Sequence, residues 1–181
     1  KFDLLKKNFN SIFKQISNDF KSIFPFVNDI DIRMLSDFNK SIISSEIPIA
    51  AIREKGDNKW IPINEISTGM FKVLLILTDL YSIPDGSIYI IDEYENSLGV
   101  NAIHFLPELL YKIENDIQIF ITSHHPYLIN KIPIENWIIL NRKGTKIEAR
   151  FGEKNKELYG KSKHDQFTNL LNDPFYNEVL L

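Results

Sequence analysis

The stretch that decides the fold is Ile88-Tyr89-Ile90-Ile91-Asp92-Glu93, a short apolar run that ends in two acids. It follows the turn signal Pro84-Asp85-Gly86, and it predicts a strand of a parallel sheet that is covered on both faces. A helical pattern at 101–114 leads to a second apolar run, Ile117 to Thr122. Strand, helix and strand in this order predict a right-handed crossover, with ligands at the carboxyl ends of the strands.

The residues upstream predict a helix and an antiparallel region. Apolar residues at three- and four-residue steps over 2–24 predict one long amphipathic helix, which Pro25 ends. Alternation of apolar and polar residues at 29–34 predicts a strand with one solvated face. The runs 47–54 and 59–63 flank a turn that contains Gly and Asn, so they predict a hairpin.

Three further segments complete the pattern. The residues of 68–81 are apolar on nearly every side and predict a buried helix. The runs 137–140 and 145–151 predict a closing hairpin, and 154–181 is weakly patterned. The predicted fold class is therefore α/β, with parallel core strands, flanking helices and a small antiparallel strand region.

Composition excludes several classes of protein. A chain of 181 residues with 44% hydrophobic content is long enough for one well-packed domain. Its 21 Lys and Arg against 24 Asp and Glu leave it nearly neutral, so a nucleic-acid partner is permitted but not indicated. No apolar run is long enough to span a bilayer, and the absence of cysteine fits a reducing cytosol. We expect a cytoplasmic protein with no membrane partner.

Asp92 and Glu93 stand where phosphoryl-transfer chemistry can use two acids, at the end of the first apolar strand. Asp92 would hold Mg²⁺ directly or through a water, and Glu93 would accept a proton from an attacking water or orient it. The simpler alternative is that both acids are solvated loop residues or cap the next helix.

Ser67-Thr68-Gly69 opens the apolar helix. A serine hydroxyl and free N–H groups at a helix start form an anion site, and glycine lets a phosphate approach the backbone closely. The alternative is an ordinary N-cap, which such a tripeptide forms more often when it is considered in isolation.

Thr122-Ser123-His124 ends the second strand, and His125 and Pro126 follow it. A histidine at this place can hydrogen-bond a γ-phosphate oxygen, or hold a water in line with Glu93. We expect one of the two histidines to be only a polar loop residue, and by position we assign the chemical role to His124.

The Ser67-Thr68-Gly69 segment, the apolar strand that leads to Asp92-Glu93 and the Thr122-Ser123-His124 segment occur in this order. Together they resemble the ATP-binding-cassette (ABC) ATPases, and within them the SMC/RecF-like branch often labelled as AAA-type ATP-binding proteins. The resemblance covers about Ile47 to Arg142. It implies a P-loop NTPase-like fold that binds ATP and Mg²⁺. In that family the signature loop corresponds to Ser67, Thr68 and Gly69, with Lys72 close behind.

The same resemblance implies roles for the residues after the signature loop. The Walker B strand corresponds to Ile88 through Asp92, with Asp92 at the metal, and Glu93 corresponds to the catalytic glutamate. His124 corresponds to the switch histidine. Glu95-Asn96-Ser97-Leu98 is similar to the D-loop, which adds Asn96 and Ser97 to the implied nucleotide-binding residues.

Three residues around the D-loop depart from the family pattern. Tyr94 stands where many relatives have Pro, and Gly99-Val100 stands where they have His-Pro. These changes bear on the conformation of the D-loop and on the coupling between two ATP sites.

The resemblance further implies a homodimer that sandwiches ATP, in which the signature loop of one subunit completes the site of the other. The P-loop, G-x-x-x-x-G-K-[ST], should precede the Walker B strand, but the Gly-Lys-Ser of this chain is Gly160-Lys161-Ser162. Asn155 occupies the place of the first glycine there, and no apolar strand leads into it. Because Lys1 opens directly inside a helical pattern, we expect the P-loop and glutamine loop upstream, and we expect this segment alone to hydrolyse little ATP.

We therefore divide the chain into a helical and strand region of the signature-containing lobe at 1–45, an ABC ATPase core at 46–152 and a C-terminal extension at 153–181. The expected function is ATP hydrolysis coupled to dimer closure, which would control a partner such as a nuclease or other effector subunit in DNA repair or antiphage defence. Two alternatives stay open. One is a nucleotide-gated interaction or sensor module with negligible hydrolysis, and the other is a structural α/β domain that only shares the pattern.

Overall fold

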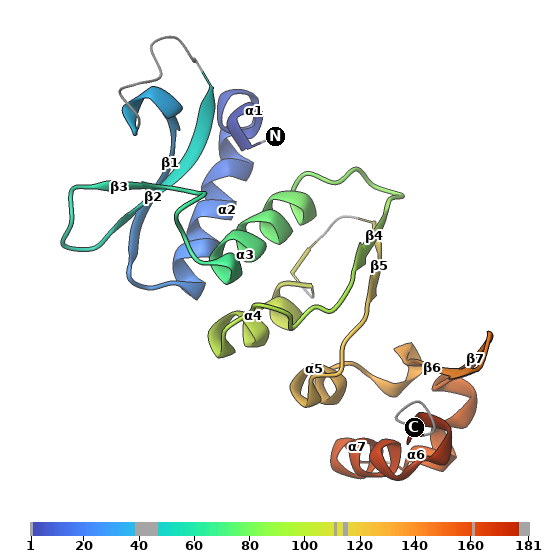
Figure 1. Cartoon of the computed structure of the whole chain (residues 1–181). Helices are drawn as coiled ribbons and strands as arrows, with labels where there is room; N and C mark the ends of the chain where they lie inside the picture. Colours follow the sequence, from blue (N-terminus) through green and yellow to red (C-terminus); the bar gives the residue numbers. More distant parts are fainter. Residues whose placement is uncertain (1, 39–46, 111, 114–115, 161, 178–181) are drawn as a thin grey trace. The chain divides into compact units, whose positions relative to one another are not determined.

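The computed structural model describes residues 2–38, 47–110, 112–113, 116–160 and 162–177. The chain forms two compact units, Lys1–Thr122 and Ser123–Leu181, and each is described by itself (Figure 1). The boundary between them rests on backbone contacts, whereas the division into 1–45, 46–152 and 153–181 rests on motifs and stays a prediction. Among the described residues, no helix has the length and apolar character needed to cross a membrane.

Unit 1 begins with two helices and a three-stranded antiparallel sheet. The helices are α1 (Phe2–Asn8) and α2 (Asn10–Ile23), and the strands are β1 (Val27–Met34), β2 (Pro48–Glu54) and β3 (Trp60–Pro62), in the order β1-β2-β3, with a short 3₁₀ turn η1 (Leu35–Asp37) after β1. Ile16 and Phe20 of α2 and Ile52 of β2 are buried in the core of this unit. The strand predicted from alternation and the hairpin predicted from its turn residues are confirmed.

The single helix predicted over 2–24 is wrong, because the chain leaves the helical conformation at Phe9. The φ of Phe9 is −136° and its ψ is 60°, and no side chain caps α2. The break separates α1 from α2, and Lys6 of α1 forms an ion pair with Asp31 of β1. Apolar periodicity continued across the break, so it could not reveal this turn.

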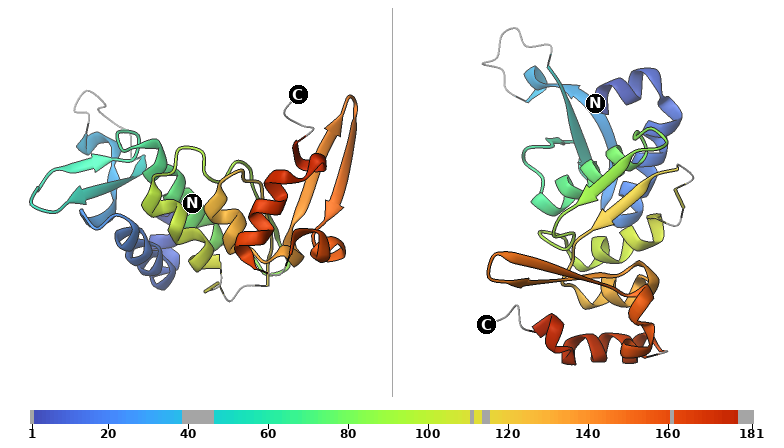
Figure 2. Two further views of the ribbon diagram at one scale, coloured as in Figure 1. Left: turned by 90° about the horizontal axis from the view of Figure 1, so that it is seen from below. Right: turned by 90° about the vertical axis from the view of Figure 1, so that its right-hand side faces the viewer.

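The second half of unit 1 is the strand–helix–strand unit. Helix α3 (Thr68–Leu80) leads to β4 (Ile88–Ile91), and α4 (Val100–Leu110) connects β4 to β5 (Gln118–Ile121). The two strands pair in parallel, with Ile88 opposite Gln118 and Ile91 opposite Ile121, and Figure 2 shows them side by side. The predicted parallel pairing is confirmed, whereas the end of the helix predicted over 101–114 lies partly outside the described residues.

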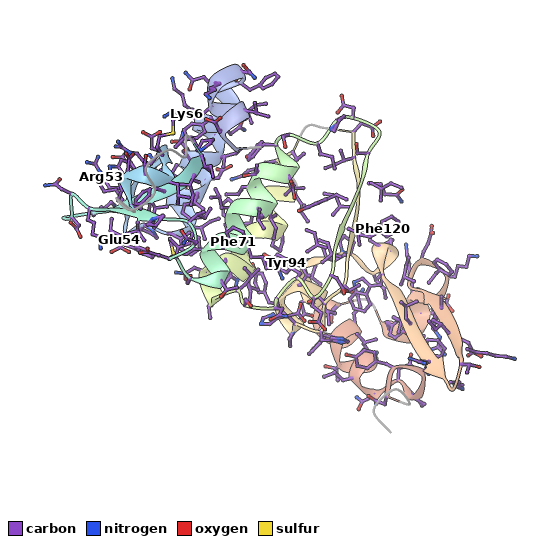
Figure 3. All side chains as sticks on the ribbon, turned by 45° about the horizontal axis from the view of Figure 1, so that its top comes forward. Lys6, Arg53, Glu54, Phe71, Tyr94 and Phe120 are labelled. Atoms are coloured by element: carbon purple, nitrogen blue, oxygen red, sulfur yellow. The ribbon has the colours of Figure 1, made fainter. Side chains whose placement is uncertain are left out.

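Strands β4 and β5 were predicted to be covered on both faces, and α3 was predicted to be a buried helix. Each of these predictions is wrong for one face of the element. Ile88 and Ile90 of β4 are 60% and 68% exposed, and Phe120 of β5 is 41% exposed. On α3, Phe71 and Leu75 are 40% and 47% exposed. Figure 3 labels Phe71 and Phe120. The physical reason is that β4 and β5 form a two-stranded sheet within the described chain, and its Ile88 face is left uncovered there.

The opposite face of β4 meets α3. Ile91 is buried, and the Tyr89 hydroxyl donates a hydrogen bond to Asp79 Oδ2 of α3 at 3.3 Å. Burial raises the pKa of Tyr89, and the nearby Asp79 carboxylate raises it further. This contact joins β4, which Asp92 follows, to α3, which Ser67 precedes.

Unit 2 is a hairpin covered by short helices. Its elements are α5 (Pro126–Lys131), η2 (Ile134–Asn136), β6 (Ile138–Lys143), β7 (Lys146–Phe151), η3 (Glu153–Asn155), α6 (Lys156–Tyr159), α7 (Lys163–Asn172) and α8 (Pro174–Asn177). The hairpin predicted from the sequence is confirmed, and Gly144 has the positive φ of 61° that its tight turn needs. The core consists of Ile134, Trp137, Ile139, Tyr159 and Leu170.

A buried carboxylate organises the end of unit 2. Asp173 accepts hydrogen bonds from the Tyr159 hydroxyl at 2.6 Å, from Arg150 Nη1 at 2.5 Å and from the Phe175 N–H at 2.9 Å. Burial alone would raise the pKa of Asp173, but these bonds outweigh it and hold the pKa below its usual range. Burial, together with the bond to Asp173, raises the pKa of Tyr159 to about 12.

We expect Asp173→Asn to lower the free energy of unfolding of unit 2 by about 2–3 kcal/mol at pH 7, because it removes the buried carboxylate that accepts from the Tyr159 hydroxyl and from the half-buried Arg150 guanidinium. The pKa of Asp173 is lower in the folded protein than in the unfolded chain. The extra stability of the natural protein over Asp173→Asn is therefore fully present above the unfolded-state pKa, and it is lost as the pH falls through the folded-state pKa. Urea unfolding followed by tryptophan fluorescence, to which Trp137 contributes, measures both effects.

The matched control is Glu135→Gln, which breaks the exposed Glu135–Lys156 ion pair and should leave the unfolding midpoint unchanged. Equal midpoints for Asp173→Asn and the natural protein at pH 7 would contradict the prediction. A difference that persists unchanged below about pH 2 would show that the carboxylate charge is not its cause.

Candidate functional site

The candidate site lies at the carboxyl end of β4, where the parallel register brings two chain segments together. Because Ile91 pairs with Ile121, the residues that follow them, Asp92 and Thr122, leave the sheet side by side. Thr122 Oγ1 donates a hydrogen bond to Asp92 Oδ1 at 2.5 Å, and the Glu93 N–H donates to Thr122 Oγ1 at 2.8 Å. Both acids are exposed, as a site for a soluble ligand requires.

Asp92 fits the role of a magnesium ligand. Its Oδ1 is held by Thr122, while Oδ2 receives no hydrogen bond from the residues that the structure describes. Within those residues no three His, Asp or Glu side chains gather into a metal site. Mg²⁺ is commonly bound through one or two carboxylates together with waters and substrate phosphates, so one oriented carboxylate is a suitable protein ligand.

The turn after Glu93 is fastened to α3 by Lys72. The Lys72 ammonium donates to the carbonyl oxygens of Glu93 at 2.9 Å and Asn96 at 3.1 Å. Asn96 Nδ2 also donates to Glu93 Oε2 at 3.3 Å, which restrains the carboxylate. The structure therefore gives Lys72 a backbone-holding contact, and its implied contact with nucleotide stays a prediction.

The predicted signature loop touches the predicted D-loop through backbone atoms. A Cβ built on Gly69 would overlap the Ser97 carbonyl oxygen, so only glycine fits this approach without movement. Ser97 itself has a φ of 65°, in the left-handed region. Ser67 caps α3 by accepting the Met70 N–H at 3.2 Å, which confirms the N-cap.

An open hollow lies beside this contact. It is lined by the predicted signature and D-loop residues together with the start of α4 and two phenylalanines, namely Phe24, Phe26, Ser67, Thr68, Gly69, Met70, Ser97, Gly99, Val100, Asn101 and Ala102. Ser67, Thr68 and Ser97 are exposed, so their hydroxyls are accessible from it. The structure thus brings together four of the residues that the family resemblance implied, Ser67, Thr68, Gly69 and Ser97.

Tyr94 anchors the same turn from the other side. It is 1% exposed, its hydroxyl donates to the Ala102 carbonyl of α4 at 2.9 Å, and its N–H donates to the Thr122 carbonyl at 3.0 Å (Figure 3). The departure from the family's proline therefore has a packing role. Sequence reasoning missed this anchor and the Thr122 bridge. Asp92 and Thr122 each follow one of the two predicted parallel strands. Placing the ends of these strands side by side would have indicated that Thr122 lies next to Asp92.

The histidine pair lies in unit 2. His125 Nδ1 accepts the Tyr127 N–H at 3.2 Å and caps α5, with Pro126 in the first turn. His125 therefore has the local structural role that was expected for one of the two histidines. His124 is exposed, and its assignment as the switch histidine stays a prediction.

A parallel strand pair joined by a crossover helix is an α/β arrangement in which ligands bind at the carboxyl ends of the strands, where this chain carries its acid pair. A family model described as "AAA domain, putative AbiEii toxin, Type IV TA system" matches residues 2–130, which is most of the chain. The chain belongs to this AAA-domain family. No curated protein sequence matches it.

Solved structures of SMC ATPase heads share the fold. A structure described under the ATP-driven dimerization and DNA-stimulated activation of SMC ATPases aligns with a TM-score of 0.56 at 12% identity, over 87% of this chain and 94% of that one. The Smc head domain with a coiled coil and joint from Pyrococcus yayanosii aligns at 0.58 and 12% identity, over 86% and 30%. The SmcHead bound to the C-winged helix domain of ScpA aligns at 0.59 and 12% identity, over 86% and 47%. The predicted α/β fold class is confirmed, and the fold resembles that of SMC ATPase heads.

We expect Gly69→Ala to destabilise unit 1 by about 1–3 kcal/mol, because the new Cβ meets a backbone carbonyl that cannot rotate away. Gly99→Ala is the matched control: Gly99 lines the same hollow, has open space around its Cβ position, and its substitution should leave the unfolding midpoint nearly unchanged. Urea unfolding of both variants measures the difference. Equal midpoints for the two variants would show that the Gly69–Ser97 contact does not constrain the loop.

Proposed function

We propose that this chain supplies the catalytic and partner-facing part of an ATPase that binds ATP with Mg²⁺ and hydrolyses it. The observation that carries the proposal is the end of β4, where the Asp92 carboxylate is held by Thr122 and the adjacent Glu93 carboxylate is exposed. Membership of the AAA-domain family and the fold of SMC ATPase heads support nucleotide binding and hydrolysis in general.

In this proposal each residue has a distinct role. Asp92 holds the metal, which neutralises charge on the phosphates when it is bound. Glu93 accepts the proton of the attacking water or orients it, and Asn96 keeps the Glu93 carboxylate in place. His124 hydrogen-bonds the γ-phosphate or the same water.

We further propose that the site is composite, with the P-loop and glutamine loop upstream of Lys1. The exposed apolar face of β4 and β5 supports this, because a parallel sheet is ordinarily covered on both faces. Ser67, Thr68, Gly69, Lys72, Asn96 and Ser97 would then meet ATP held by a second copy of the chain. The open hollow beside Gly69 and Ser97 supports such an approach, since it leaves the Ser67 and Ser97 side chains accessible.

The proposed assembly is a cytoplasmic homodimer whose closure controls a partner, such as a nuclease or other effector subunit, in DNA repair or antiphage defence. Two similar structures support the general scheme: one is described with ATP-driven dimerization, and another was solved with the C-winged helix domain of ScpA. A second candidate function is a nucleotide-gated sensor that does not turn ATP over. The unusual Gly99-Val100 after the D-loop favours it, because this change affects the segment that would couple two sites.

We expect Glu93→Gln in the intact protein to lower phosphate release by at least about 100-fold, because the group that handles the attacking water's proton is lost. The ATP-bound dimer should last longer, since hydrolysis no longer ends it. Phosphate release and size-exclusion chromatography with ATP measure the two effects. Glu54→Gln, at the end of β2, is the control and should behave as the natural protein does.

Two results would decide against the hydrolytic role. Unchanged turnover in Glu93→Gln would remove Glu93 from the reaction. An intact natural protein that binds ATP but releases no phosphate above background would favour the sensor function instead.

A further inference from the structure

We infer that Thr122 is the positioning residue of this site: its hydroxyl sets the orientation of the Asp92 carboxylate and of the Glu93 backbone together. The inference rests on the proposed function, because it concerns how the same acids act on metal and water. It assigns a chemical task to a residue that otherwise marks only the end of β5. The geometry that supports it lies entirely within unit 1.

The argument starts from the hydrogen-bonding capacity of a hydroxyl group. A threonine Oγ1 has one proton to donate and lone pairs to accept with. Here the proton goes to Asp92 Oδ1 at 2.5 Å, a short charge-assisted bond, while a lone pair accepts the Glu93 N–H at 2.8 Å. The two bonds fix each other, since the donation determines where the accepting lone pairs point. Both hydrogen bonds need the hydroxyl group. Valine has nearly the same shape as threonine but can make neither of them.

The backbone of Thr122 continues the same pattern. Its N–H donates to the Ile91 carbonyl at 3.0 Å, and its carbonyl accepts the Tyr94 N–H at 3.0 Å. Thr122, which directly follows β5, therefore binds four consecutive residues, 91–94, as the chain leaves β4. The side chain provides the two bonds that reach the acids.

The turn needs such support because its backbone is unfavourable. Glu93 has a φ of 43°, in the left-handed region, which costs a residue with a Cβ roughly 1–2 kcal/mol. Such a conformation persists only where its surroundings determine it, and it often does so at functional sites. The bond from the Glu93 N–H to Thr122 Oγ1 is one of these determinants, and the bond from Lys72 to the Glu93 carbonyl is another.

The consequence for chemistry follows from the two oxygens of Asp92. With Oδ1 engaged by Thr122, the carboxylate plane is held and Oδ2 is left for the metal. Groups that orient a metal ligand typically change metal affinity or activity by 10–100-fold when they are removed. Loss of the Thr122 hydroxyl should therefore raise the Mg²⁺ requirement and slow turnover, with little effect on the apparent affinity for ATP at saturating Mg²⁺.

The experiment compares Thr122→Val with Thr122→Ser in the intact protein. Valine keeps the shape and the backbone bonds but lacks the hydroxyl, whereas serine keeps the hydroxyl. We expect Thr122→Val to raise the Mg²⁺ concentration for half-maximal phosphate release and for half-maximal ATP-dependent dimerisation by about tenfold. The kcat should fall while the KM for ATP changes by less than about threefold, and Thr122→Ser should stay within about threefold of the natural protein.

Thr78→Val is the matched control, because Thr78 also donates its hydroxyl, at 2.6 Å, but to the Leu74 carbonyl inside α3. It should alter only the unfolding midpoint, which is measured for every variant without nucleotide. A merely structural Thr122 would behave like Thr78, with a shifted midpoint and an unchanged Mg²⁺ requirement.

The outcomes separate the two proposals. If the natural protein hydrolyses ATP and Thr122→Val shows the same Mg²⁺ requirement, the inference is overturned and the proposed function stands. A tenfold Mg²⁺ shift in Thr122→Ser would also overturn the inference, and this holds even if Thr122→Val fails to fold. A natural protein that neither binds nor hydrolyses ATP would overturn both.

Discussion

The parallel register of β4 and β5 is the constraint on which the candidate site depends. It sets Ile91 opposite Ile121 and so places Asp92 next to Thr122, although they are 30 residues apart in sequence. A shift of one residue in this register would move the Thr122 hydroxyl away from the acid and turn alternate side chains to the other face. The acids are therefore positioned by backbone pairing first and by side-chain hydrogen bonds second.

From this register the connections extend through the turn to α3. Three hydrogen bonds hold the turn after β4. The Thr122 hydroxyl accepts the Glu93 N–H, the Tyr94 hydroxyl donates to a carbonyl of α4, and Lys72 of α3 donates to the Glu93 carbonyl. The carbonyl of Ser97, farther along, meets Gly69 at the start of the same helix. Movement of the acids would therefore be transmitted to the predicted signature loop at the start of α3, and in the proposed composite site this is a physical route between its two halves.

The order of the elements and the place of the acid pair at a strand end could be read from the sequence, because both depend on local patterns. Apolar run, acid pair, helix and second apolar run predicted the crossover, and the Ser67 cap was predicted from its place before an apolar helix. The break at Phe9 and the exposed faces of β4 and α3 could not be read. Apolar periodicity reports which side chains prefer burial, but not whether the described chain supplies something to cover them, as Ile88 and Ile90 show.

The contacts that orient the site also could not be predicted from the sequence, for a different reason. Lys72 lies 21 residues before Glu93, and its ammonium could equally have been assigned to a phosphate, since a lysine near a signature loop has either use. Only the structure shows it on two backbone carbonyls. Its positive charge beside the turn still favours the approach of phosphates. A backbone-holding lysine and a phosphate-attracting lysine are therefore compatible, because the carbonyl bonds fix where the charge is held.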